Sequence, residues 1–191
     1  KSFPFLLIAA LPTILVSVLL FNPSLAQQSN QATTPDVPQE NWVSLPNLSA
    51  EQLALVPTAC CGLYVDGEFP PAITDGSLIL SAGSSEFNGD TQQTTINNNI
   101  DIRYENIWLQ ADNGIYDQLQ AVIELNGNFR LRQPGLAIGA ASAIFSQSEA
   151  SAELLNTSYV LFDQAARGTA EEIIFRNADG TLSITEGSYT V

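Results

Sequence analysis

The chain has 191 residues and a formal net charge of −14, because twenty acidic residues are set against six basic ones. This negative balance excludes binding to a nucleic-acid backbone, which requires a basic face, and argues against attachment to an anionic membrane surface. The sequence contains no histidine, which removes the usual general base, the Ser-His-Asp arrangement and most zinc sites.

The first residues predict a secretory signal peptide, residues 1–26. Lys1 is the only charge before an apolar run over residues 3–21, and a stretch with small residues then ends at Ala26. A basic start, an apolar middle and a small-residue site predict cleavage after Ala26. A retained membrane anchor is the alternative, and two prolines within the run disfavour it.

Residues 27–59 predict a flexible linker. Residues 27–40 are rich in Gln, Ser, Thr, Asn and Pro, which is the composition of a disordered tether. Ser49-Ala50-Glu51-Gln52 has the spacing of a capping box, so a short helix is expected there. Residues 60–191 are then expected to form one domain. The absent initiator Met and the alternation still running at Val191 lead us to expect a fragment at both ends.

From Thr74 onward, apolar and polar residues alternate. Runs such as Ile100-Asp101-Ile102 have the period-two pattern of half-buried strands, so we expect an all-β domain. Turn signals are expected between the runs, at Asp75-Gly76, Asn88-Gly89-Asp90, Asn113-Gly114, Asn126-Gly127, Pro134-Gly135 and Asp179-Gly180.

An internal repeat of about thirty residues runs through this region. A polar group followed by two alternating apolar residues recurs, at Asn97–Ile102, Asn126–Leu131, Asn156–Leu161 and Glu186–Val191. Such a repeat predicts an elongated, twisted β-jellyroll or solenoid-like stack of about four units, each with two or three short strands. Its apolar core would run the length of the stack, and the strands at both ends would leave unpaired backbone groups.

The apolar residues of the repeats suggest two interpretations. One is a plain hydrophobic core; the other is a core that opens along its length into a groove for acyl chains. Aromatic residues, Trp108 and Phe162 included, are expected to point inward. The groove candidates are Ile102, Leu109, Ile123, Phe129, Leu131, Phe145, Tyr159, Leu161 and Ile174.

The sequence offers no catalytic constellation. It has neither a phosphate-binding glycine loop nor a calcium loop, and the adjacent Glu171 and Glu172 would point to opposite faces of a strand. We therefore expect no enzyme, no metal site and no cofactor. Arg103, Arg130 and Arg132 should lie on the face opposite the apolar residues, as ordinary outward charges rather than as ligands for lipid phosphates.

Cys60 and Cys61 are adjacent, and neighbouring cysteines rarely bond with each other because the geometry strains the backbone. In an exported protein they are expected to pair with cysteines outside this sequence, and free thiols are the alternative.

Several segments resemble the N-terminal, OstA-like domain of the LPS-assembly protein LptD family. The resemblance covers about residues 60–191 and is carried by Cys60-Cys61-Gly62-Leu63-Tyr64-Val65-Asp66, Leu109–Asp117, Gly127–Leu131, Pro134–Ala143 and Arg167–Glu171. It implies a V-shaped β-jellyroll in the periplasm, followed in the family by an outer-membrane barrel that is missing here. Cys60 matches the family's N-terminal cysteine and Cys61 is additional, so which of the two would pair with the barrel stays open.

The resemblance also implies a function and partners. The domain would sit at the periplasmic face of the outer membrane, receive lipopolysaccharide in an apolar groove and pass it to the barrel. It would bind the periplasmic bridge protein LptA by β-edge pairing, and the plug lipoprotein LptE through the missing barrel. Two alternatives remain, an LptA- or LptC-like bridge component and a repeat-built structural or adhesin β protein.

Overall fold

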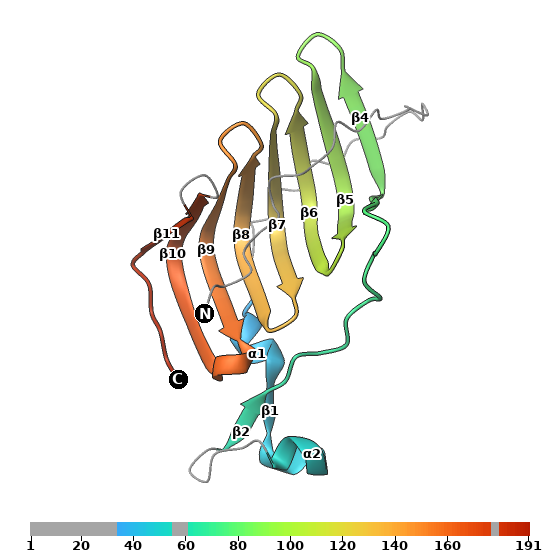
Figure 1. Cartoon of the computed structure of the whole chain (residues 1–191). Coiled ribbons are helices and arrows are strands. Elements are labelled where there is room, and N and C mark those ends of the chain that lie inside the picture. The colour runs from blue at the N-terminus through green and yellow to red at the C-terminus, as the bar shows by residue number, and fades with distance from the viewer. Residues whose placement is uncertain (1–33, 55–60, 177–179) are drawn as a thin grey trace.

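The computed structural model describes residues 34–54, 61–176 and 180–191. The predicted signal peptide, its cleavage site at Ala26 and Cys60 lie outside the described residues. Most of the described chain forms one large antiparallel sheet with the strand order β11-β10-β9-β8-β7-β6-β5-β3, and β4 pairs with the other half of β5 (Figure 1). The predicted all-β fold is confirmed. No helix in the described part of the chain is long and apolar enough to cross a membrane.

From β5 to β11, strands that follow one another in the chain lie side by side, so this part of the sheet is a meander. Its strands are β3 (Leu78–Ser81), β4 (Ser84–Asn88), β5 (Gln93–Tyr104), β6 (Ile107–Asp117), β7 (Val122–Gln133), β8 (Leu136–Ser146), β9 (Ser151–Leu161), β10 (Ala166–Arg176) and β11 (Thr181–Thr185). Between β9 and β10 lies the 3-10 turn η2 (Phe162–Gln164). Each repeat of about thirty residues therefore supplies two strands of 11 or 12 residues, instead of the two or three short strands expected.

A line of β-bulges crosses the middle of these long strands. The pairing register shifts between Asn97 and Ile100 in β5, and between Asn126 and Phe129 in β7. Asn98 and Asn128 have φ of 63° and 45° at these places, and Asn156 has φ of 49° at the unpaired position of β9. Asn tolerates this conformation better than most residues. In β5 and β7 the polar element of the repeat is thus a bulge, which bends a strand, and not a turn that ends one.

Two predicted turns are wrong for this reason. Asn113-Gly114 and Asn126-Gly127 lie inside β6 and β7, at the bulge line. Asn88-Gly89 and Pro134-Gly135 do fall at strand connections, as predicted.

The sheet bends along the bulge line, and its inner face forms the main core. Phe145 of β8 is in register with Ile123 of β7, six residues before Phe129. Six residues of straight strand would span about 20 Å, yet the ring centroids of Phe129 and Phe145 are 6.0 Å apart. The two halves of the strands therefore converge, and the inner cluster they enclose contains seventeen buried residues, among them the fully buried Leu125 and Phe129.

The N-terminal segment lies against the outer face of the sheet. Its elements are α1 (Val37–Asn41), β1 (Trp42–Ser44), η1 (Leu45–Asn47), α2 (Ala50–Leu53) and β2 (Gly62–Tyr64), and β1 pairs with β2 as an antiparallel hairpin. Figure 1 shows α1 beside the lower ends of β8 and β9, with the hairpin and α2 below the sheet. We call residues 34–54 and 61–73 the strap.

The strap confirms one prediction and corrects another. The capping box at Ser49 is present, because Gln52 N–H donates to Ser49 Oγ at 3.2 Å and Ser49 N–H donates to Gln52 Oε1 at 2.8 Å. The flexible linker predicted for residues 27–59 is wrong for its described part, since Val37 is only 3% exposed and packs on Ala137 and Val160 of the sheet.

Candidate functional site

The inner face of the sheet gathers eight of the nine groove candidates. Side chains directly opposite one another on antiparallel strands share a face, so the register assigns each residue to a side. Ile102, Phe129, Leu131, Phe145 and Tyr159 are buried in the inner cluster, and Leu109, Ile123 and Leu161 pack against it. In this structure these side chains fill a core by contacting one another.

The ninth candidate, Ile174, is on the outer face. Ile173 pairs with Leu154 and belongs to the inner cluster, whereas Ile174 pairs with Glu153. The pairing of β10 with β9 skips Glu171 at the bulge line, which shifts the alternation by one residue. The prediction was wrong because an alternating pattern read across a bulge changes face.

Two aromatic residues also lie outside instead of pointing inward. Trp108 pairs with Arg103 and Arg132, and its Nε1–H donates to Asp101 Oδ2 at 2.7 Å. Phe162 packs beside Ala137 and Val160, in the cluster under the strap. Both side chains therefore make their contacts on the outer face of the sheet.

The apolar inner face becomes exposed at both ends of the sheet. At the first end, Leu80 is opposite Ile102 and is 43% exposed, and Phe87 is opposite the buried Thr94 and is 37% exposed. At the other end, Leu182 and Ile184 are opposite Phe175 and Ile173 and are 52% and 47% exposed. We call these ends the β3–β4 mouth and the β11 mouth. The interior is therefore continuous with apolar surface at each end.

The edge strands at the two mouths carry little charge. β3 and β11 contain no charged residue, and β4 contains only Glu86. Charges on edge strands are a common device against pairing with another sheet, so their scarcity leaves these edges open to a further strand.

β11 pairs only with the second half of β10, and the first half of β10 pairs instead with the C-terminal residues of the chain. Arg167 N–H donates to Thr190 O at 2.8 Å, and Thr190 N–H donates to Arg167 O at 2.9 Å. Tyr159 O–H donates to Ser188 O at 2.7 Å, and burial raises the pKa of Tyr159. The C-terminal residues thus extend the sheet beside β10.

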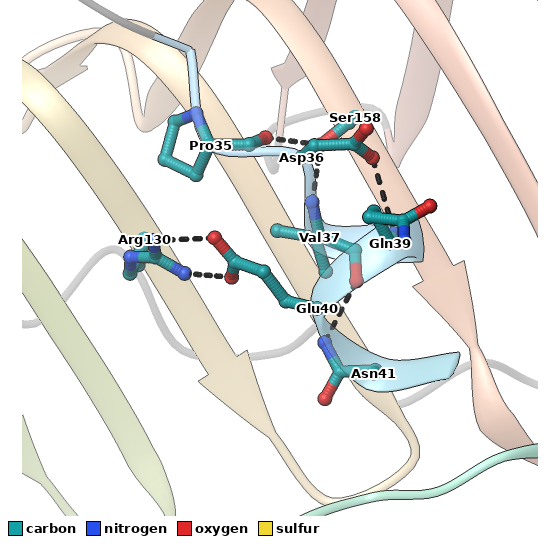
Figure 2. A network of polar contacts seen from close by, with 8 residues as sticks. All are labelled: Pro35, Asp36, Val37, Gln39, Glu40, Asn41, Arg130 and Ser158. Carbon is teal, nitrogen blue, oxygen red and sulfur yellow. Dashed lines mark hydrogen bonds and ion pairs between the residues drawn. The ribbon is translucent and has the colours of Figure 1, made fainter. Parts of the chain in front are cut away.

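Arginine side chains of the outer face hold the strap. Arg130 forms a bidentate ion pair with Glu40 of α1, in which Nη2–H donates to Oε1 at 2.8 Å (Figure 2), and this contact raises the pKa of Arg130. Arg132 Nη2–H donates to Asp66 Oδ1 at 2.7 Å. Arg167 donates to the Tyr64 hydroxyl and lies 5.5 Å from the centre of its ring. The predicted outward position of Arg103, Arg130 and Arg132 is confirmed by their pairing.

A serine at the bulge line fixes the start of the strap. Ser158 Oγ donates to Pro35 O at 2.6 Å and accepts from Val37 N–H at 3.1 Å (Figure 2). The lack of a side chain at Gly139 lets the start of the strap approach the sheet this closely. A Cβ at this position would lie 2.7 Å from Pro35 O and 2.7 Å from Val37 Cγ2. Sequence reasoning missed this contact, although Asp36 followed by Val37-Pro38 is a helix-start signal, and Asp36 Oδ1 does accept from Gln39 N–H at 3.1 Å.

Replacing Ser158 by Ala is expected to lower the free energy of unfolding by about 1–3 kcal/mol, because Val37 N–H and Pro35 O would be left buried and unpaired. Urea unfolding followed by circular dichroism measures the change. Ser183→Ala, at an exposed serine on β11, is the matched control and should differ from the unsubstituted chain by less than about 0.5 kcal/mol. Equal losses for the two variants would show that Ser158 does not hold the strap.

Cys61 is exposed and free in the described structure, and Cys60 lies outside it. Among residues 34–54, 61–176 and 180–191, no three His, Cys, Asp or Glu side chains are grouped so as to hold a metal ion. The disulfides expected for Cys60 and Cys61 stay a prediction.

These features define a class: a bent, meandering all-β domain with an apolar inner face exposed at two mouths. Over 167 residues the chain is 29% identical to an LPS-assembly protein LptD of Pseudomonas syringae pv. syringae, covering 82% of this chain and 18% of that protein. It is 31% identical over 155 residues to an LptD of Saccharophagus degradans, covering 78% of this chain and 18% of the relative. The resemblance to the LptD family is confirmed, and the chain spans about a fifth of the length of these relatives.

No protein-family model matches the chain. Among solved structures, LptH, the LptA-homologous periplasmic component of the lipopolysaccharide transport device of Pseudomonas aeruginosa, aligns with a TM-score of 0.48 and 10% identity, covering 59% of this chain and 85% of that one.

Proposed function

We propose that this chain is the periplasmic domain of an outer-membrane lipopolysaccharide-assembly protein, that it is exported, and that it works without catalysis. It receives the acyl chains of lipopolysaccharide on its inner face and passes them toward a barrel formed by another part of the protein. The LptD relatives support the transport role. The observation that carries the mechanism is the apolar inner face, which crosses the sheet from one exposed mouth to the other.

The physical need for such an interior follows from the cargo. Each methylene of an acyl chain costs about 0.8 kcal/mol to expose to water, so a lipid with several chains needs continuous shielding. The inner cluster is packed in this structure, so loading would replace contacts between side chains with contacts to acyl chains. Mouths at both ends would allow entry at one and exit at the other.

The edges supply the proposed partner contact. The uncharged backbone edges of β3 and β11 can each accept a strand from a periplasmic bridge protein such as LptA, which would continue the apolar interior from one protein into the next. The plug lipoprotein LptE would act through the barrel. We also propose that the signal peptide is cleaved after Ala26. Cys60 or Cys61 would then form disulfides with cysteines outside this sequence.

Uptake of a fluorescent fatty acid, competed by lipopolysaccharide, tests this function. We expect saturable binding to the chain and displacement by lipopolysaccharide. Ile184→Asp, on the inner face at the β11 mouth, should weaken uptake at least about threefold by placing a charge in the path of the chain. Ser183→Asp, the adjacent exposed residue on the outer face, is the matched control and should change uptake little. A folded chain without saturable uptake would overturn the proposal and favour a structural or adhesin protein.

A further inference from the structure

All five arginines of the chain lie on the outer face of the sheet. Arg103 pairs with Trp108, which pairs with Arg132, and the same transverse row continues through Ala137 and Val160 to Arg167. Arg130 lies in the adjacent outer row, opposite Gly139. Arg176 follows the inward Phe175 and therefore points outward. Lys1, the sixth basic residue, lies outside the described residues.

Most of these cations already have partners within the chain. Glu40 engages Arg130, Asp66 engages Arg132, and Asp101 lies 3.2 Å from Arg103. The Tyr64 ring and hydroxyl engage Arg167. Three of these four guanidinium groups thus already face a carboxylate, whose charge opposes the approach of a phosphate.

The inner face of the sheet is apolar, in contrast to the arginine-bearing outer face. The inner cluster consists of apolar side chains and the Tyr159 ring, and the chain has twenty acidic residues against six basic ones. Glu86 and Glu172, the acidic residues next to the inward Phe87 and Ile173, point outward like the arginines. A phosphate held at a mouth would therefore meet no arginine of the inner face. The net negative charge of the chain would repel it, and this repulsion would weaken as salt screens it.

We infer that the interior selects its ligand by the acyl chain and not by the phosphates. An uncharged amphiphile should bind more tightly than a phosphorylated one with the same chain, and the phosphates of a bound lipopolysaccharide should stay in water with cations from solution. This inference rests on the proposed function, because it concerns what the same interior accepts.

Titration calorimetry with dodecyl maltoside and dodecyl phosphate, each below its critical micelle concentration, tests the inference on the unsubstituted chain. At low sodium chloride we expect dodecyl phosphate to bind about three- to tenfold more weakly than the maltoside. High sodium chloride should close this gap by tightening dodecyl phosphate alone. Tighter binding of dodecyl phosphate that salt then weakens would overturn the inference and leave the proposed function standing. Failure of both amphiphiles to bind would overturn the function itself.

A pair of neighbouring residues provides matched variants. Leu80 and Ile79 are 43% and 42% exposed, but Leu80 pairs with the inward Ile102 and Ile79 with the outward Arg103. Leu80→Lys should strengthen dodecyl phosphate relative to the maltoside at least about threefold, because it places a cation at the β3–β4 mouth. Ile79→Lys should shift this ratio less, and equal shifts for the two variants would contradict the inference. The salt dependence of the unsubstituted chain decides the matter if a variant does not fold.

Discussion

Replacing Phe129 by Ala is expected to lower the free energy of unfolding by about 3–5 kcal/mol, enough to unfold a marginally stable domain. The ring is fully buried and meets Phe145 across the bulge line, where the two halves of the sheet converge. Its removal leaves a cavity at the place where the bend is packed, and neighbouring strands paired on both sides restrict collapse into it.

Urea unfolding followed by circular dichroism measures this loss. Phe87→Ala is the control, because this ring also faces inward but is 37% exposed at the β3–β4 mouth. We expect the control to lose about 1–2 kcal/mol, since more than a third of its surface is already in water. Similar losses for both variants would mean that the bend does not depend on the inner cluster.

Replacing Gly139 by Val is expected to detach the start of the strap and to lower the free energy of unfolding by about 1–3 kcal/mol. A Cβ at this position would already lie 2.7 Å from Pro35 O, which accepts the hydrogen bond from Ser158. Because Pro35 O is a backbone atom, a change of side-chain rotamer cannot relieve this clash, and the strap itself must move.

Limited proteolysis measures the detachment, since α1 should become accessible to cleavage before the sheet unfolds. Gly89→Val is the control, at a turn where a Cβ would meet only the Phe87 ring, at 4.0 Å. Cleavage within residues 34–54 should accelerate in the Gly139 variant alone. Unchanged cleavage there would contradict the proposed packing of the strap.

Much of the sheet could be predicted because its strands alternate regularly. The alternation around Ile102 and Phe129 identified their inward faces, and the thirty-residue repeat identified structurally equivalent strand pairs. The nature of the polar element could not be predicted in the same way. Asn and Gly favour left-handed backbone both in turns and in bulges, so Asn126-Gly127 alone does not show whether the strand ends or continues.

The errors in the candidate site follow from the same feature. Ile174 was assigned to the wrong face because the alternation of inward and outward side chains shifts by one residue at the unpaired Glu171. The strap was missed because its contacts join residues far apart in the sequence, Glu40 with Arg130 and Pro35 with Ser158. A polar, proline-containing segment predicts a tether unless the surface that receives it is known.

Photo-crosslinking to lipopolysaccharide tests the central claim most directly. A photoreactive residue at Leu80, Phe145 or Ile184 places the probe on the inner face, and one at Ile79 or Ile174 places it on the outer face at the same strands or their neighbours. We predict crosslinks from the inner positions and few from the outer ones. Equal crosslinking from Ile79 and Leu80, or none from any inner position in a folded chain, would contradict an acyl-chain path along the inner face.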